Sequence, residues 1–235
     1  MAEGTLYGLG VGPGDPELVT LKALRLARAC PVLAYPAPEQ GDSLARKIMA
    51  PHLAGGQTEI AIRVPMAADR HPANAVYDQS SRDIAAHLAA GRDVAVLCLG
   101  DPFFYGSFMY LFARLAATHR TVVVPGVTSL SAAAASLGAP LTSRNDVLTV
   151  IPALLDDAAI AARLDAADTA AIIKLGRHFA RVRALLAAKG LLNASRYVEH
   201  ASFAQERVVP MPDVDPAGVP YFSLVLVHRR GRAWL

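Results

Sequence analysis

The first half of the chain alternates short apolar runs with longer segments whose apolar residues recur at helical spacing. This pattern predicts strands over residues 5–11, 31–35, 58–64, 93–99 and 121–124, and helices over 16–30, 43–53, 74–90 and from about 107. In the first helix, Leu18, Leu21 and Leu24 recur along one face, and Asp15 followed by Pro16 is a typical helix start. Strands that alternate with helices indicate βαβ units with a largely parallel sheet.

The second half of the chain carries more strands and fewer helices. Strands are expected over residues 147–151, 169–175, 195–202, 206–210 and 221–228, and helices mainly over 156–166 and 178–189. The small residues 132–135 are expected to form a helix face that allows close packing. We therefore predict two α/β domains, residues 1–120 with a largely parallel sheet and residues 121–235 with a mixed sheet, joined near residues 119–123.

Composition narrows the class of protein. Of the 235 residues 53% are hydrophobic, yet no apolar run approaches the roughly 18 residues that span a bilayer. The chain shows no charged-then-apolar leader, so we expect a cytoplasmic protein without a membrane partner. The net charge of +3 favours an anionic substrate, but the charges form no stripe that would indicate a nucleic-acid partner.

Cysteines and histidines give no pattern typical of a metal site. Cys30 and Cys98 lack paired spacing and lie in apolar runs, so we expect small core side chains. The seven histidines are scattered along the chain. We therefore expect no metal bound by the protein itself.

Three glycine-bearing turns follow predicted strands, at residues 8–14, 99–106 and 125–129. In the second turn, Pro102 cannot donate to a sheet and Gly100 permits a close approach of a ligand. Asp101 offers a carboxylate beside it, as a ligand contact or as the N-cap of the next helix. Open α/β sheets bind ligands at the carboxyl ends of their strands, so the three turns together predict a site.

The first turn does not match a dinucleotide-binding fingerprint. If the motif begins at Gly8 its third glycine falls on Pro13, and if it begins at Gly10 it falls on Asp15. Pro13 removes a donor and Asp15 adds a negative charge, so the turn suits a ligand that is cationic or neutral at the contact. A nicotinamide-dependent oxidoreductase remains an alternative that this spacing disfavours.

Taken in order, the three turns resemble those of the tetrapyrrole (corrin/porphyrin) methylase family. The matching stretches are residues 11–23 beginning Val-Gly-Pro-Gly-Asp-Pro, Leu-Gly-Asp-Pro at 99–102, and Val-Pro-Gly-Val-Thr-Ser at 124–129. Residues 64–66, 105–111, 129–141, 174–177 and 220–223 are similar to the branch that methylates carbon 20 of precorrin-2 in cobalamin synthesis. Uroporphyrinogen methylases usually carry a second glycine where Leu99 stands, so the chain departs from that branch.

The resemblance implies the tetrapyrrole methylase fold, a homodimer, and S-adenosylmethionine (SAM) as methyl donor in a cleft between the domains. It implies methylation of precorrin-2 to precorrin-3A; another ring position, cobalt-precorrin-2 as substrate and a non-catalytic tetrapyrrole carrier stay as alternatives. The positions that correspond to the family's cofactor contacts are Pro13, Leu99, Gly100, Asp101, Phe104, Thr128, Ser129, Leu175, Ala201 and Phe222.

A tetrapyrrole with several carboxylates requires fixed cations around its pocket. Guanidinium groups pair with carboxylates through two hydrogen bonds. The candidates beside the predicted cleft loops are Arg63, Arg70, His71, Arg144 and Arg177, with Tyr105 as a further substrate contact. No catalytic base is assigned, because a structural role is favoured for each candidate, namely Tyr105, Glu199 and His200.

Overall fold

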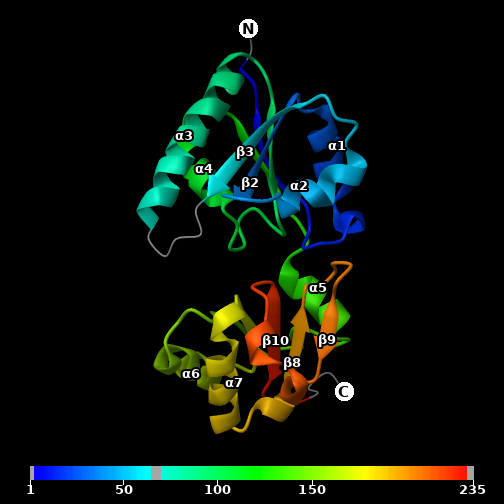
Figure 1. The fold of residues 1–235 in the computed structure, drawn as a ribbon, viewed down its shortest axis with the longest axis vertical. Helices are drawn as coiled ribbons and strands as arrows, with labels where there is room; N and C mark the ends of the chain where they lie inside the picture. Colours follow the sequence, from blue (N-terminus) through cyan, green and yellow to red (C-terminus); the bar gives the residue numbers. More distant parts are fainter. Residues whose placement is uncertain (1–2, 65–69, 232–235) are drawn as a thin grey trace. The chain divides into compact units, whose positions relative to one another are not determined.

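The chain folds into two compact units, Met1–Thr128 and Ser129–Leu235, each with its own five-stranded sheet (Figure 1). This computed structural model describes residues 3–64 and 70–231, without the side chains of residues 70–73. The prediction of two α/β units is confirmed. The units divide later than the expected boundary at residue 120, because strand β5 (Thr121–Val124) pairs in parallel with β1 (Leu6–Gly10) of the first sheet.

The first sheet is parallel in every strand pair of its described residues, with the order β3-β2-β4-β1-β5. The remaining strands are β2 (Val32–Pro38), β3 (Thr58–Val64) and β4 (Val94–Cys98). Helices α1 (Leu21–Ala29) and α2 (Leu44–Met49) cover one face, and α3 (Arg70–Ala89) and α4 (Phe108–Leu115) cover the other (Figure 1). Short 3-10 turns η1 (Pro16–Leu18) and η2 (Ala50–His52) complete the connections.

Alternating side chains of the buried strands supply two separate cores, as the two-residue period of a strand requires. Leu9, Leu33 and Leu97 pack with α1 and α2 on one face. Leu6 and Val96 pack with α3 and α4 on the other face. Both faces are therefore sealed, and the loops at the strand ends remain to carry function.

The predicted helix over residues 16–30 is two elements, because two capping residues lie close together. The Asp15 carboxylate accepts from the Glu17 N–H (2.8 Å) and begins η1, whereas the Thr20 hydroxyl accepts from the Ala23 N–H (3.2 Å) and begins α1. The predicted helix over residues 43–53 likewise divides into α2 and η2, with Pro51 inside η2.

The second sheet has the order β6-β7-β10-β8-β9. Its strands are β6 (Leu148–Pro152), β7 (Thr169–Ile173), β8 (Ser195–Glu199), β9 (Arg207–Val209) and β10 (Ser223–His228). Strands β6 and β7 are parallel, while β10 is antiparallel to β7 and β8, so the predicted mixed sheet is confirmed.

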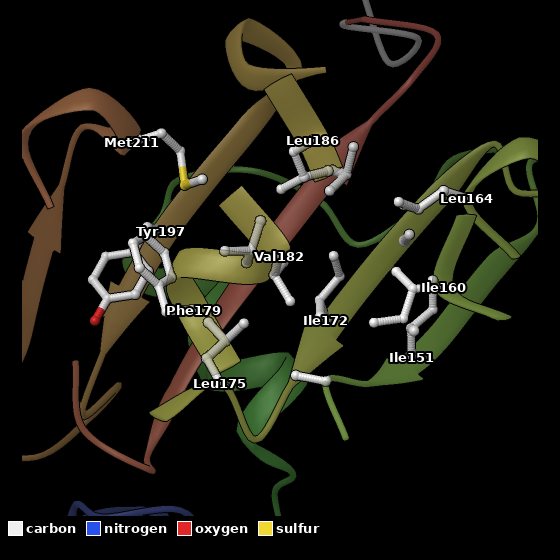
Figure 2. Close-up of a cluster of buried hydrophobic side chains, with 14 of the residues drawn as sticks. Ile151, Ile160, Leu164, Ile172, Leu175, Phe179, Val182, Leu186, Tyr197 and Met211 are labelled. Carbon is white, nitrogen blue, oxygen red and sulfur yellow. The ribbon is translucent and has the colours of Figure 1, made fainter. Parts of the chain in front are cut away.

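The helices of this unit are α5 (Ser129–Ser136), α6 (Asp157–Ala166) and α7 (Phe179–Ala188), with turns η3 (Gly176–His178), η4 (Leu192–Ala194), η5 (Met211–Asp213) and η6 (Pro216–Gly218). Helices α6 and α7 bury one face of the sheet around Ile172, Leu175 and Phe179 (Figure 2). The rings of Phe179 and Tyr197 meet edge to face at 5.3 Å, which fixes α7 against β8.

Both cysteines are buried, as expected for small core side chains. Burial raises the pKa of Cys30 to about 12 and also raises that of Cys98, so both thiols stay protonated and inert at neutral pH. Among the residues described, no helix is long and apolar enough to cross a membrane.

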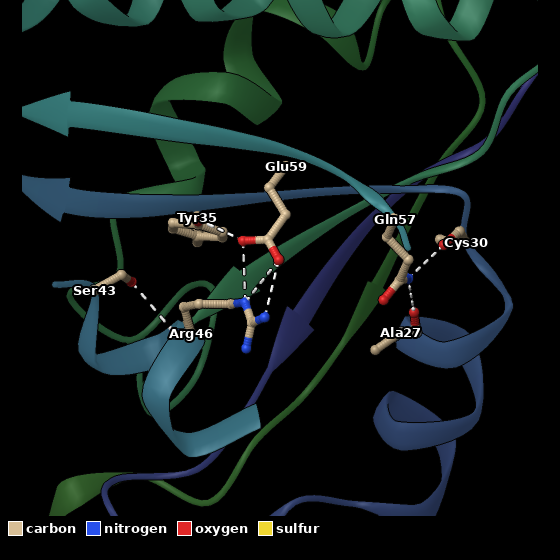
Figure 3. Close-up of polar contacts among 7 residues, drawn as sticks. All are labelled: Ala27, Cys30, Tyr35, Ser43, Arg46, Gln57 and Glu59. Carbon is tan, nitrogen blue, oxygen red and sulfur yellow. Dashed lines mark hydrogen bonds and ion pairs between the residues drawn. The ribbon is translucent and has the colours of Figure 1, made fainter. Parts of the chain in front are cut away.

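A half-buried glutamine closes the carboxyl end of α1. The Gln57 side-chain amide donates to the carbonyl oxygens of Ala27 (2.8 Å) and Cys30 (2.6 Å) (Figure 3). Carbonyls at the end of a helix lack partners within the helix. Nearby, Arg46 pairs with the Glu59 carboxylate at 2.9 Å, and the Tyr35 hydroxyl donates to the same carboxylate (Figure 3).

We expect Gln57→Ala to lower the free energy of unfolding by about 1–2 kcal/mol, because two helix-end carbonyls lose their partner. Urea unfolding measures the change. Gln79→Ala is the matched control, since the Gln79 amide bonds to Asp83 one turn further along the exposed face of α3. We expect a change within about 0.5 kcal/mol there. Equal losses in the two variants would contradict the role assigned to Gln57.

Candidate functional site

Three loops of the first unit meet at the carboxyl edge of its sheet. They follow β1, β4 and β5, which are neighbours in the order β4-β1-β5. Gly12 and Gly100 form an antiparallel bridge between the first two loops. The Gly100 N–H donates to the Gly12 carbonyl at 2.7 Å, and the Gly12 N–H donates to the Gly100 carbonyl at 3.3 Å. The loops after β1 and β4 are thus held together by backbone hydrogen bonds.

The third loop approaches so closely that side chains are excluded. A Cβ atom built on Gly126 would lie 2.1 Å from the Gly100 carbonyl oxygen and 2.8 Å from the Gly10 Cα. A Cβ atom on Gly10 would lie 2.5 Å from the Gly126 Cα. Glycine is required at both positions because the three loops touch backbone to backbone.

The Asp101 carboxylate joins the second loop to the third. Its Oδ1 accepts from the N–H groups of Phe103 (2.9 Å) and Phe104 (3.1 Å), which closes the turn after β4. Its Oδ2 accepts from the Gly126 N–H at 3.0 Å. Asp101 is not the N-cap of the next helix, because α4 begins at Phe108 with Ser107 as its N-cap. The Asp101 carboxylate instead closes the preceding turn and makes a bond across 25 residues of sequence. Oδ1 thus accepts two bonds, whereas Oδ2 accepts one and has further lone-pair capacity toward a ligand.

The second loop presents aromatic side chains on a tightly folded backbone. The rings of half-buried Phe104 and exposed Tyr105 meet edge to face at 5.1 Å. Tyr105 has a left-handed backbone with φ of 54°. A Cβ atom on Gly106 would lie 2.5 Å from the Pro102 carbonyl oxygen, so the loop folds back onto itself.

The other expected cofactor contacts of this part of the chain differ in exposure. Pro13 and Gly100 are buried, whereas Leu99 and Thr128 are half-buried. Ser129 is exposed as the first residue of α5, which belongs to the second unit.

The second unit gathers the remaining three positions, Leu175, Ala201 and Phe222, at one edge of its sheet. Register explains this, because antiparallel β10 starts where β7 and β8 end: Leu224 pairs with Ile173, and Ser223 with Glu199. The His200 N–H also donates to the Phe222 carbonyl at 2.7 Å. The Leu175 side chain itself is fully buried in the core beside Phe179 (Figure 2).

Strained backbone concentrates at this edge. Lys174, His200 and Ser202 have left-handed φ angles of 61°, 50° and 68°. Each such residue costs about 1–3 kcal/mol, so its surroundings must fix it. Sequence reasoning missed Lys174, because lysine gives no signal for a left-handed position. Burial also lowers the pKa of Lys174.

The candidate bases are in different environments. Glu199 is only 7% exposed, and its carboxylate accepts from the Tyr197 hydroxyl (2.7 Å) and pairs with Arg207 (2.9 Å). Burial and then this hydrogen bond raise the pKa of Tyr197. Both Glu199 oxygens are thus engaged, which favours a structural role. The buried Nδ1 of His200 has no hydrogen-bond partner among the described residues.

The predicted cations are distributed over both units. Arg63 lies near the carboxyl end of β3, and its Nη1 contacts the carbonyls of Pro38 (2.9 Å), Glu39 (3.3 Å) and Gly41 (3.4 Å). Arg177, in η3, is exposed at the edge that carries Ala201 and Phe222.

Arg144 precedes β6. Because β6 is parallel to β7, Arg144 lies at the opposite end of the second sheet from Arg177. The backbones of Arg70 and His71 lie in the first turn of α3, and their side chains lie outside the described residues. Within the described ranges, no group of three or more His, Cys, Asp or Glu side chains is placed to hold a metal ion.

Residues 5–213 match the family model of Tetrapyrrole (Corrin/Porphyrin) Methylases. The chain is 47% identical over 234 residues to the Cobalamin biosynthesis protein CobIJ of Mycobacterium tuberculosis, covering 96% of this chain and 46% of the relative. It thus spans about half the length of the first curated relatives. It is 38% identical to a Precorrin-2 C(20)-methyltransferase of Sinorhizobium, covering 95% of each chain. Identity is 35% to a Cobalt-precorrin-2 C(20)-methyltransferase of Salmonella typhimurium, covering 97% of each.

Solved structures give the same family. A cobalt precorrin-4 methyltransferase superposes with a TM-score of 0.72 and 25% identity, covering 95% of this chain and 94% of the other. A uroporphyrin-III C-methyltransferase from Thermus thermophilus, complexed with S-adenosylhomocysteine, gives a TM-score of 0.68 and 26% identity, covering 95% and 92%.

We expect Gly126→Ala to separate the three loops, since the added methyl group would lie 2.1 Å from the Gly100 carbonyl oxygen. The loss of stability should be about 1–3 kcal/mol, and hydrogen exchange at the amides of Gly12 and Gly100 should accelerate. Gly218→Ala is the control, because its Cβ atom would meet only Asp215 Oδ2 at an ordinary 3.8 Å. Unchanged exchange at both amides in Gly126→Ala would contradict the backbone contact.

Proposed function

Because the chain belongs to the tetrapyrrole methylase family, we propose that it methylates carbon 20 of precorrin-2 to precorrin-3A with SAM as methyl donor, in cobalamin synthesis. The observation that carries the proposal is the 38% identity to a precorrin-2 C(20)-methyltransferase over 95% of both chains. These relatives give no support to a nicotinamide-dependent oxidoreductase or a tetrapyrrole carrier.

We propose that the loops of the first unit bind SAM. The proposal is supported by the close backbone contact of the loops at Gly10 and Gly126, where a Cβ atom would meet another loop. It is also supported by Gly100, which has a left-handed φ of 69° and lacks a side chain that would shield its peptide groups from a ligand. The side chains proposed to contact it are Pro13, Leu99, Asp101, Phe104 and Thr128. Asp101 brings a carboxylate that suits the ammonium or hydroxyl groups of this donor.

In the second unit we propose Ser129, Ala201 and Phe222 as further SAM contacts. Leu175, whose side chain is fully buried, is proposed to contribute through the backbone of its turn rather than through its side chain. The unpartnered Nδ1 of His200, next to Ala201, supports a polar ligand group at this edge.

When bound, SAM supplies a methyl group on a sulfonium centre, and a carbon of the macrocycle displaces the sulfur. The sulfonium charge disappears as the methyl group moves, so an apolar surround formed by side chains such as Phe104 favours transfer. Positioning of the two reactants supplies most of the rate, which for well-aligned groups amounts to roughly 7–11 kcal/mol. The loops fixed by Asp101 and the glycine contacts serve that positioning.

A second candidate substrate is cobalt-precorrin-2, since the Salmonella relative is named for it and is similarly close to the chain. Incubation with SAM and precorrin-2, with and without cobalt, tests both candidates. We expect one added methyl group at carbon 20, identified by mass and by NMR of the product. A product methylated at another ring position would overturn the assignment of carbon 20.

We expect Asp101→Ala to weaken binding of S-adenosylhomocysteine by roughly 1.5–3 kcal/mol, because the tie to Gly126 and an acceptor for the ligand are lost together. Asp101→Asn should have a smaller effect, since its amide oxygen can still close the turn. Calorimetry measures both affinities. Asp42→Ala, which removes an exposed carboxylate that pairs with exposed Lys47, is the control. An unchanged affinity in Asp101→Ala would leave this residue with a structural role in its turn alone.

We propose that Arg63 and Arg177 bind substrate carboxylates, together with Tyr105, while Arg70, His71 and Arg144 stay as further candidates. Arg177→Ala should raise the KM for the macrocycle more than the KM for SAM, and added salt should weaken macrocycle binding most. Arg144→Ala, at the other end of the same sheet, should have the smaller effect. If the alanine variants of all five candidate cations kept the wild-type KM for the macrocycle, other residues would have to bind the substrate carboxylates.

We further propose a cytoplasmic homodimer that acts without nucleic acid, membrane or a metal held by the protein. The high hydrophobic content of 53% supports a buried interface. Light scattering at micromolar concentration should give twice the 24.8 kDa mass of one chain.

A further inference from the structure

We propose that Glu206 is a positioning residue for the methyl donor. Its carboxylate fixes the turn His200–Phe203, which carries Ala201, against helix α5, which begins at Ser129. The inference rests on the proposed function, because Ala201 and Ser129 are SAM contacts only there. Glu206 itself is not expected to touch SAM.

A single carboxylate oxygen makes both connections. Glu206 Oε2 accepts from the Ser202 N–H at 2.5 Å and from the Ser136 hydroxyl at 2.7 Å. Ser136 is the last residue of α5 and lies 70 residues away in sequence. Its hydroxyl is also 3.0 Å from the Ala132 carbonyl, but the carboxylate is the nearer and stronger acceptor. The turn and the helix are therefore joined through Glu206.

The turn needs this support because its backbone is strained on both sides of Ala201. His200 and Ser202 have φ angles of 50° and 68°, which side chains disfavour. The His200 N–H bonds to the Phe222 carbonyl (2.7 Å), which anchors one side of the turn to β10. Glu206 anchors the other side through Ser202. Removing that anchor lets Ser202 relax toward ordinary angles and moves Ala201.

Glu206 is required as a hydrogen-bond acceptor rather than as a negative charge. Both partners are neutral donors, and the neighbouring Arg207 directs its guanidinium to Glu199 instead. Among the described residues, Glu206 forms no ion pair within 4.0 Å. A glutamine can supply an amide oxygen in the same place, whereas an alanine cannot. This difference separates positioning from a mere requirement for negative charge.

The experiment compares Glu206→Ala, Glu206→Gln and Ser136→Ala with the control Asp213→Ala, which removes an exposed carboxylate of the same unit. Calorimetry gives the Kd for S-adenosylhomocysteine, steady-state kinetics gives the KM for SAM and kcat, and hydrogen exchange reports the Ser202 amide. Thermal unfolding of each full-length variant identifies any general loss of structure.

We expect Glu206→Ala to raise the Kd and the KM for SAM about tenfold, with kcat at saturating SAM nearly unchanged and faster exchange at Ser202. Glu206→Gln should restore both constants to within about twofold of wild type. Ser136→Ala should raise the Kd by a smaller factor and leave Ser202 protected, since only the tie to α5 is cut. If Glu206→Ala unfolds, the Kd of Ser136→Ala for S-adenosylhomocysteine tests the proposal.

An unchanged Kd in both Glu206→Ala and Ser136→Ala, or a tenfold loss that Glu206→Gln does not restore, would overturn the positioning role. A wild-type protein that binds no S-adenosylhomocysteine would instead overturn the proposed function, and the inference with it. The two failures are distinguished by the wild-type titration alone.

Discussion

Backbone contact at the carboxyl edge of the first sheet is the constraint on which the candidate site depends. The order β4-β1-β5 brings three loops together, and Gly10 and Gly126 let them meet without side chains between them. The Asp101 carboxylate then fixes the arrangement, because it bonds to two amides of its own turn and to the Gly126 amide. Any residue with a Cβ atom at Gly126 would move all three loops.

In the second unit, strand register rather than close backbone contact brings distant segments together. Its antiparallel β10 returns beside the ends of β7 and β8, so residues from three distant segments share one edge. Left-handed backbone at Lys174, His200 and Ser202 shapes this edge. Glu199, its most buried carboxylate, is committed to Tyr197 and Arg207. Such an edge offers backbone and ring contacts more than free acid–base groups, which suits the methyl transfer proposed for it.

Local pattern accounts for much of this architecture. The strands at 58–64 and 121–124 have the predicted bounds, because β-branched and alternating residues there are bounded by clear breaks. The sequence pattern did not predict features that depend on contacts between residues distant in sequence. A Cβ atom on Gly8 would lie 2.4 Å from the Phe108 ring, so this glycine serves core packing. Sequence spacing likewise does not reveal features that depend on the chain topology. These are the Asp101–Gly126 bond, the position of Arg144 away from Arg177, and the Ser136–Glu206 contact.

The most direct test of the account is methyl transfer from SAM carrying a ¹³C-labelled methyl group to precorrin-2, followed by NMR of the isolated product. We expect a single labelled methyl group on carbon 20, formed by the wild-type protein and formed poorly by Asp101→Ala at limiting SAM. Binding of S-adenosylhomocysteine without any labelled product from precorrin-2 or its cobalt complex would contradict the central claim.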